Sequence, residues 1–328
     1  MIPRALISCL FVVISLLLTI SKGFSSEFTM DPLGLFGFKN KTLQDRIVSD
    51  AQSLPQDIDI VLAYDFTSSN AQMGINSFGG KSLHHLFDKE DVRHNPYQVV
   101  TKLILANLLS DESEKEFRVL GFGDEASIAS FDGVRILKRK KKKPIVGLYR
   151  VLKVYRSYRK KTIMSGPTSF AGPIRIASQQ AAENKRHTLL IIITDGALSP
   201  GLAQQETFEA LASASSNPLS VLIIGVGDGT ERERKGSFPG LEVFKSLKDD
   251  AVDRTGITGG INGQLNFDNV DFVNANDFLG GAHAVNEAST RLELFLRRCA
   301  EKVVLQREFM EKHNMIEGLS WDERRSGV

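Results

Sequence analysis

The stretch "IDIVLAYDFTSSN" (58–70) changes character halfway along and indicates how the chain folds. Its first half, residues 58–64, is a nearly continuous apolar run of strand length, as expected for a strand covered on both faces. Directly after this run, Asp65, Thr67 and Ser69 stand at alternate positions. A buried strand that ends in a carboxylate and two hydroxyls predicts a ligand site at its carboxyl end.

The same pattern returns along the chain. Apolar runs rich in Ile, Val and Leu predict further strands at 117–123, 187–196, 219–229 and 270–276. Helical periodicity predicts helices at 42–54, 95–111, 145–161, 173–185, 203–216 and about 277–312. Strands that alternate with helices predict a three-layer, Rossmann-like α/β domain, with a mainly parallel central sheet and helices on both faces.

The ends of these runs supply five oxygen-bearing side chains. Because parallel strands end at one edge of a sheet, Asp65, Thr67 and Ser69 are expected to meet Thr168 of "SGPTSF" (165–170) and Asp195 of "TDG". Two carboxylates and three hydroxyls are hard ligands that suit Mg²⁺ or Mn²⁺, with Ca²⁺ as an alternative. Too few protein charges surround the ion, so water or a partner's carboxylate would complete its coordination. The alternative is a purely structural role, in which these side chains cap helices and close turns.

Several motifs together resemble a known family. "DFTSSN", "SLHHL", "NPY", "GFGD", "GPTSF", "LLIIITDG" and "PLSVLIIGVGDG" are similar, in this order, to the copine domain, a variant of the von Willebrand factor A fold. The resemblance covers about residues 42–310 and is strongest to the copine domain of plant RING-type ubiquitin ligases. It implies a metal-ion-dependent adhesion site (MIDAS) at Asp65, Thr67, Ser69, Thr168 and Asp195. It also implies a non-enzymatic, divalent-cation-dependent protein-binding module, whose partner supplies an acidic residue.

The chain departs from the family at both ends. Copines carry two lipid-binding C2 domains upstream, and 56 residues are too few for one. The plant ligases carry a C-terminal RING, and the expected tail, 313–328, contains no Cys. Calcium-triggered membrane docking and ubiquitin transfer are therefore not expected of this chain. An adaptor or substrate-binding part of a ubiquitin-ligase system remains an alternative.

The N-terminal segment indicates targeting. Arg4 precedes the apolar run 5–20, and small residues follow, so residues 1–23 are expected to be a signal peptide cut after Gly23 or an uncleaved anchor. An upstream start codon that is seldom used is a third interpretation; the compartment would then be cytoplasmic or nuclear, as for most of the family. Residues 24–41 are expected to be a linker to the domain, 42–312.

Composition narrows the function classes. With 42% hydrophobic and 24% charged residues, the 328-residue chain is ordinary for a globular protein. Two cysteines, Cys9 and Cys299, exclude a disulfide framework and Cys-rich zinc modules. The glycine turns "GVGDG" and "GFGDE" do not complete a nucleotide-binding motif, so no nucleotide cofactor is expected. His84 and His85 are expected to have structural or surface roles, and Cys299 is expected to be a packing residue of the last helix.

A basic segment stands apart from the acidic remainder. Residues 135–161 hold thirteen Lys or Arg and no acid, so the net charge of +2 becomes −11 without them. The run Lys138, Arg139, Lys140, Lys141, Lys142 and Lys143 lies in a loop, 138–144, before an amphipathic helix. A solvated surface is the plainest interpretation. The alternatives are an anionic membrane surface, another polyanion such as nucleic acid, or a nuclear import signal.

Overall fold

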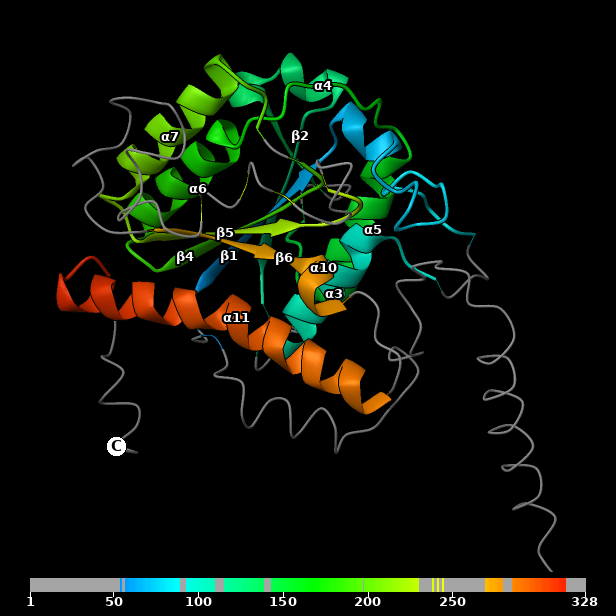
Figure 1. Ribbon diagram of the computed structural model, residues 1–328. Helices are drawn as coiled ribbons and strands as arrows, with labels where there is room; N and C mark the ends of the chain where they lie inside the picture. The colour runs from blue at the N-terminus through cyan, green and yellow to red at the C-terminus, as the bar shows by residue number, and fades with distance from the viewer. Residues whose placement is uncertain are drawn as a thin grey trace, which may run out of the picture.

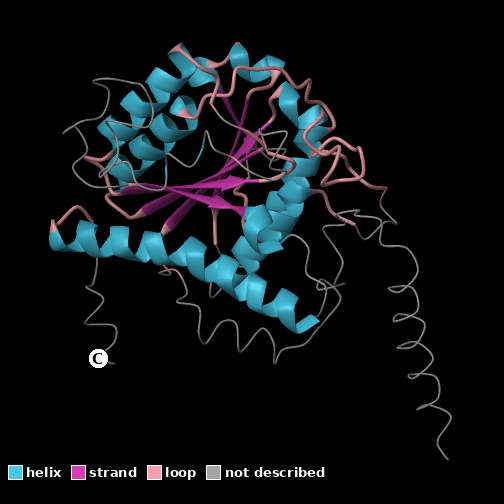
Figure 2. Ribbon diagram, in the orientation of Figure 1, coloured by secondary structure: helices cyan, strands magenta, loops and turns pink. Residues whose placement is uncertain are grey.

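Six strands form one central sheet, with helices on both of its faces, in the computed structural model (Figure 1, Figure 2). The structure describes residues 54, 57–88, 93–109, 115–138, 143–196, 198–229, 238, 241, 244, 269–279 and 285–316. The strands are β1 (Asp59–Asp65), β2 (Phe117–Phe122), β3 (Val134–Ile136), β4 (Thr188–Thr194), β5 (Leu219–Gly225) and β6 (Val270–Asn274). Their order is β3-β2-β1-β4-β5-β6, and every neighbouring pair is parallel except β2 and β3.

Alternation along the central strand divides the core in two. On β1, Ile60, Leu62 and Tyr64 join one buried cluster, whereas Val61 and Ala63 join the other. Successive side chains of a strand point to opposite faces, so a strand that is apolar throughout requires cover on both sides. The predicted three-layer α/β fold with a mainly parallel sheet is confirmed.

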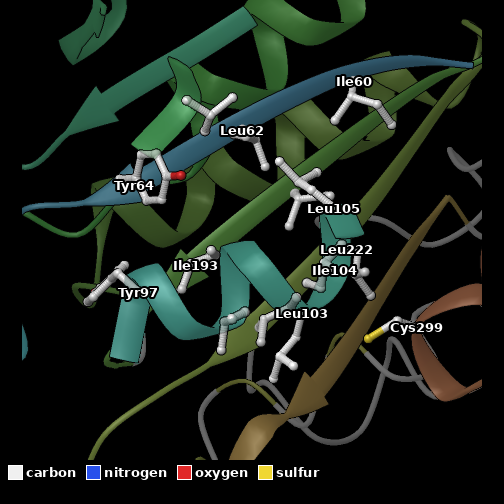
Figure 3. Close-up of a cluster of buried hydrophobic side chains, with 14 of the residues drawn as sticks. Ile60, Leu62, Tyr64, Tyr97, Leu103, Ile104, Leu105, Ile193, Leu222 and Cys299 are labelled. Atoms are coloured by element: carbon white, nitrogen blue, oxygen red, sulfur yellow. The ribbon is translucent and has the colours of Figure 1, made fainter. Parts of the chain in front are cut away.

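Each face of the sheet has its own helices (Figure 1). The first cluster includes side chains of α3 (Pro96–Leu108), α5 (Leu148–Arg159) and α11 (Val285–Lys312). Figure 3 shows part of it, with Leu103 and Ile104 of α3 packed beneath β1 and Cys299 nearby. The second cluster includes side chains of α6 (Ala171–Asn184) and α7 (Leu202–Ala214). Cys299 is a buried free thiol, so its predicted packing role is confirmed.

Local signals place the helix ends close to their predicted positions. The start of α3 is a capping box. The Asn95 side chain accepts a hydrogen bond from the Gln98 backbone amide, and the Gln98 side chain accepts one from the Asn95 backbone amide. Pro96 occupies the first turn, where its missing N–H costs nothing. The strands predicted at 58–64, 117–123, 187–196 and 219–229 are β1, β2, β4 and β5, with ends shifted by a few residues.

Three elements differ from the sequence prediction. The edge strand β3 and the four-residue helix α4 (Glu125–Ile128) were not predicted, because both are too short to show a period. The single helix predicted over 277–312 is instead α10 (Ala275–Leu279) followed by α11.

Several sequence predictions lie outside the described residues. They are the signal or anchor segment 1–23, the linker 24–41, the helix predicted at 42–54 apart from Leu54, and the cations 139–142. Within the part of the chain that the structure does describe, no helix combines the length and apolarity needed to cross a bilayer.

Candidate metal centre

Two buried carboxylates meet at the carboxyl edge of the sheet. Asp65 is the last residue of β1, and Asp195 directly follows β4. Because β1 and β4 are parallel neighbours, with Tyr64 opposite Ile193, both side chains reach the same edge. Neither residue is exposed to solvent. The predicted convergence of these two acids, 130 residues apart in sequence, therefore follows from strand order.

The loop after β1 connects the two acids through hydroxyls. Asp65 Oδ1 accepts a hydrogen bond of 2.8 Å from the Thr67 amide, which turns the chain back over the strand end. Thr67 Oγ1 lies 3.0 Å from Ser69 Oγ, and Ser69 Oγ donates to Asp195 Oδ1 at 3.0 Å. Four of the five predicted site residues thus form one connected cluster.

Thr168 reaches the same region through its backbone. The Ser68 amide donates to the Ser165 carbonyl at 2.6 Å, and Thr67 pairs with Ser165 in an isolated parallel bridge. Thr168 is buried, and its amide and carbonyl bond to the hydroxyl and amide of Ser199. These bonds hold the 165–168 loop beside the end of β1, and they involve the backbone of Thr168 and not its hydroxyl.

The electrostatics of the cluster favour a cation. Burial raises the pKa of Asp65, and burial together with the neighbouring Asp65 charge raises the pKa of Asp195 well above its usual range. The Asp195 Oδ2 atom is buried and has no hydrogen-bond partner among the described residues. A buried acceptor without a partner costs free energy. A divalent cation would supply that partner and compensate both carboxylates, so the residues present are compatible with a bound ion.

The donor set limits which ion could bind. Among the described residues there is no cluster of three or more His, Cys, Asp or Glu side chains that could hold a metal. A site here would therefore depend on two carboxylates, hydroxyls and water. Those are the ligands of Mg²⁺ and Mn²⁺, whereas zinc prefers nitrogen and sulfur.

Asn70 is a part of the cluster that the sequence pattern did not single out. Its Nδ2 donates to Asp195 Oδ1 at 2.9 Å and lies within hydrogen-bond distance of the Asp65 and Thr67 carbonyls. The Tyr97 hydroxyl donates to Asn70 Oδ1 at 2.6 Å, which fixes the orientation of the amide. The only sequence signal is its place at the end of "DFTSSN", one residue after the last predicted ligand.

His84 has the structural role that was predicted for it. Its Nε2 lies 2.6 Å from the Asp65 carbonyl, which can only accept, so Nε2 carries the proton. Nδ1 then accepts from the Tyr155 hydroxyl at 2.7 Å. Burial lowers the pKa of His84 to about 3, so the ring is neutral at physiological pH. The neutral imidazole is hydrogen-bonded through both ring nitrogens, and its bond to the Asp65 carbonyl helps to fix the backbone at the end of β1.

The glycine turn "GVGDG" also has a structural use. Asp228 accepts hydrogen bonds from the amides of Asn76 and Ser77 at 2.8 and 2.6 Å. This carboxylate therefore closes the turn that follows the candidate metal loop, and its oxygens are occupied by the chain itself.

The fold and this edge cluster define a three-layer α/β domain that carries its candidate ligand site at the carboxyl ends of parallel strands. Comparison of the sequence with family models gives the family. The Copine model matches residues 82–306. The chain belongs to the copine family.

Relatives are found among animal copines and plant ligases. Copine family protein 1 of Caenorhabditis elegans is 32% identical over 174 residues, which cover 52% of this chain and 14% of that protein. E3 ubiquitin-protein ligase RGLG4 of Arabidopsis thaliana is 33% identical over 181 residues, which cover 52% of this chain and 43% of the ligase. The chain thus spans less than half the length of either relative.

Similar solved structures are more distant. The SpRpn10 VWA domain is 14% identical with a TM-score of 0.34, and the match covers 52% of this chain and 75% of that one. Proximal thread matrix protein 1 from the mussel byssus is 16% identical with a TM-score of 0.39, over 76% of this chain and 50% of that one. The family assignment rests on the sequence match.

Proposed function

We propose that this chain is a non-enzymatic protein-binding module whose binding depends on a divalent cation. Asp65, Thr67, Ser69, Thr168 and Asp195 would hold Mg²⁺ or Mn²⁺, directly or through water. The remaining coordination position would accept a carboxylate from the partner protein. The observation that carries the proposal is the buried Asp195 Oδ2 atom, which has no hydrogen-bond partner among the described residues and lies beside a second buried carboxylate.

The chain's own residues would prepare this site for a cation. The Thr67 amide and the Ser69 hydroxyl each occupy one oxygen of a carboxylate and so fix its direction. Asn70 bonds to Asp195 Oδ1, which leaves Oδ2 as the free oxygen of that residue. A bound ion would supply a positive centre for an acidic side chain of the partner. Two protein carboxylates match a divalent ion in charge, so a third carboxylate from outside adds affinity without a large excess of negative charge.

Names of relatives support an interaction role within a larger system. Several are E3 ubiquitin-protein ligases, and the chain matches part of their length. By analogy the domain would capture a protein for another component to act on. That role needs a binding site and no catalytic residue of its own.

Thermal unfolding of the full chain tests the metal directly. The midpoint is measured with EDTA, Mg²⁺, Mn²⁺ or Ca²⁺ for the wild type and for Asp195→Asn, which keeps the acceptor for Ser69 and removes the charge. A ligand that binds only the folded state adds about 2.7 kcal/mol at a concentration of 100 Kd. We expect Mg²⁺ or Mn²⁺ to raise the wild-type midpoint and to leave the variant unchanged.

A matched control separates the site from general charge effects. Asp132→Asn also removes one carboxylate, and Asn tolerates the positive φ of 58° at this loop position. This variant should keep the full metal response. If no ion shifts the wild type, or if both variants lose the shift equally, the metal site does not exist as proposed.

Partner binding is tested with defined peptides. Peptides selected from a random display library in Mg²⁺ and released by EDTA should contain an Asp or Glu whose replacement by Asn or Gln abolishes binding. Selected peptides that bind equally well in EDTA, or that carry no required acid, would contradict the adhesion mechanism while leaving the metal result intact.

A further inference from the structure

A strongly basic groove lies between the edge strand β3 and helix α5. Its volume is about 800 Å³. Six of the eleven residues that line it are cationic and none is acidic; the cations are Arg135, Lys138, Arg150, Lys153, Lys160 and Lys161. The six-residue basic run contributes only Lys138 to this list, since Lys143 lines a different groove and 139–142 lie outside the described residues. The fold, and not the run itself, therefore assembles the charge.

Helical and strand periods explain how these residues share one surface. Arg150, Lys153 and Ser157 recur every three or four residues and so lie along one side of α5, and Lys161 follows in the turn just after the helix. The other side of the helix, with Val151 and Tyr155, is buried in the core. On the strand side, Leu137 belongs to the same core cluster as α5, and Arg135, two residues earlier, faces the same way.

Among the described residues, most of this charge has no acidic partner. Arg135 lies 3.6 Å from Asp124, which also accepts from the Tyr158 hydroxyl. No ion pair in the described part of the chain involves Lys138, Arg150, Lys153, Lys160 or Lys161. A concave surface lined by one sign of charge concentrates the field and attracts counter-ions.

A second groove of the same protein is lined by both positive and negative side chains. It has a volume of about 770 Å³ and lies at the amino-terminal end of the neighbouring strands. Its cations, including Lys143 and Arg186, are accompanied by three acids, Asp59, Glu116 and Glu183. Arg186 pairs with Asp59 at 3.7 Å. The two grooves have similar volumes, but only the groove along α5 lacks acidic lining residues.

We propose that the groove between β3 and α5 binds a compact ligand that carries several phosphate groups, of the inositol polyphosphate type. Cations spread along the helix and the strand can each meet a different phosphate, and the Ser157 hydroxyl adds a neutral donor. The volume falls within the range of small-ligand pockets, about 300–1,000 Å³. Such a ligand could be free in solution or form the headgroup of a membrane lipid.

The geometry favours this ligand over nucleic acid. Single-stranded nucleic acid binds through bases stacked on open aromatic rings. Among the described residues that line the groove, Tyr158 is the only aromatic one, and the Arg135 guanidinium covers its ring at 4.7 Å from the centroid. The groove therefore offers cations and hydroxyls without an open aromatic platform.

Calorimetric titration of the full chain with inositol hexakisphosphate tests the proposal. EDTA is present throughout, so that the candidate metal site makes no contribution. One variant carries Lys153→Gln, Lys160→Gln and Lys161→Gln. Each of these three lysines lines the groove and is exposed. The matched control carries Lys143→Gln, Arg297→Gln and Lys312→Gln, which remove the same charge from exposed positions outside this groove.

We expect the wild type to bind, the groove variant to lose more than about tenfold in affinity, and the control to change by less than about twofold. Flotation with phosphatidylcholine vesicles, with and without phosphatidylinositol 4,5-bisphosphate, then shows whether the lipid form is also captured and whether inositol hexakisphosphate competes with it. Unchanged thermal midpoints confirm that both variants are folded. Equal losses in the two variants, no binding of either phosphate probe, or a stronger and groove-dependent binding of single-stranded RNA would overturn the proposal.

Discussion

Thr194 Oγ1 donates a hydrogen bond of 2.5 Å to Asp65 Oδ2, which joins the ends of two neighbouring strands 129 residues apart. Asp65 Oδ1 is occupied by the Thr67 amide. Both oxygens of this carboxylate therefore have a donor, in contrast to Asp195, whose Oδ2 has none within the described chain. In the candidate metal centre, the described chain thus provides hydrogen-bond donors to both oxygens of Asp65 but to only one oxygen of Asp195.

Removal of the Thr194 hydroxyl should destabilise the metal-free protein. Thr194→Val takes away the donor to a buried carboxylate, and a buried polar group left without its partner costs about 1–3 kcal/mol. Urea unfolding in EDTA measures the loss. Thr188→Val makes the same change at the other end of β4, where the hydroxyl bonds only to a neutral carbonyl at 3.3 Å, and should cost less. Equal losses at the two positions would contradict the special role of Thr194.

Neutralisation of Asp195 should stabilise the metal-free protein at pH 7. The folded-state pKa of Asp195 is raised by burial and by the nearby Asp65 charge, so the folded protein holds this proton more tightly than the unfolded chain does. The contribution of this group to stability therefore falls as the pH rises from the unfolded pKa of about 3.9 through the raised folded pKa.

Asp195→Asn removes that pH dependence because an amide does not titrate. The difference in free energy of unfolding between variant and wild type, measured in EDTA, should grow in favour of the variant as the pH rises. Each unit by which the pKa is raised corresponds to about 1.4 kcal/mol. A variant that is less stable than the wild type at neutral pH would show that the buried charge is already compensated without a metal.

A side chain at Gly123, which directly follows β2, should displace Thr67 in the loop after β1. Gly123 has a φ of +77°, and a Cβ placed there would overlap the Thr67 Cγ2 methyl. Gly123→Ala should lower the free energy of unfolding by more than the cost of about 1–2 kcal/mol per residue that the left-handed backbone imposes on an L side chain. It should also weaken the response to Mg²⁺, since Thr67 must move.

Gly133→Ala is the matched control for this change. Gly133 has a similar φ of +65°, but among the described residues no atom beyond its own and its chain neighbours' lies within 4 Å of the position that a Cβ would take. It should therefore show the backbone cost alone and keep the metal response. Identical behaviour of the two variants in both measurements would show that the overlap with Thr67 has no consequence.

Mild acid should destabilise the fold through two buried histidines. Burial, together with the nearby Arg307 charge, lowers the pKa of His187 to about 3, and burial lowers the pKa of His84 to about 3. The unfolded chain takes up these protons near pH 6.5, about three units before the folded protein does. Stability is therefore fully present above about pH 6.5 and is lost at about 1.4 kcal/mol per pH unit for each histidine as the pH falls toward 3.

His187→Gln should reduce this slope by the share of one histidine. The amide can still bond to the Ser220 hydroxyl, which lies 2.8 Å from His187 Nε2. Free energies of unfolding are compared over the acid range for the wild type, His187→Gln and the exposed-site control His313→Gln. If the His187 variant follows the same slope as the wild type, the imidazole is protonated in the folded state.

The candidate site was partly predictable because its residues follow a local rule. Polar side chains at the ends of apolar runs must lie where strands end, and parallel strands end at one edge. Asp65, Thr67, Ser69 and Asp195 therefore appear in the sequence as one cluster before any coordinates are known. Asn70 and Thr194 do not, because their importance lies in which atom each one contacts across the sheet.

The sequence by itself determined the longer strands and helices, their burial on two faces and the set of oxygen donors, because periodicity and capping depend on neighbours within a few residues. Tertiary structure alone decided that Asp195 Oδ2 lacks a partner within the described chain, that His84 is neutral, and that Arg135 of β3 joins Lys153 of α5 in one groove. Those facts depend on the strand order β3-β2-β1-β4-β5-β6. That order brings together side chains far apart in the chain, and no local pattern encodes it.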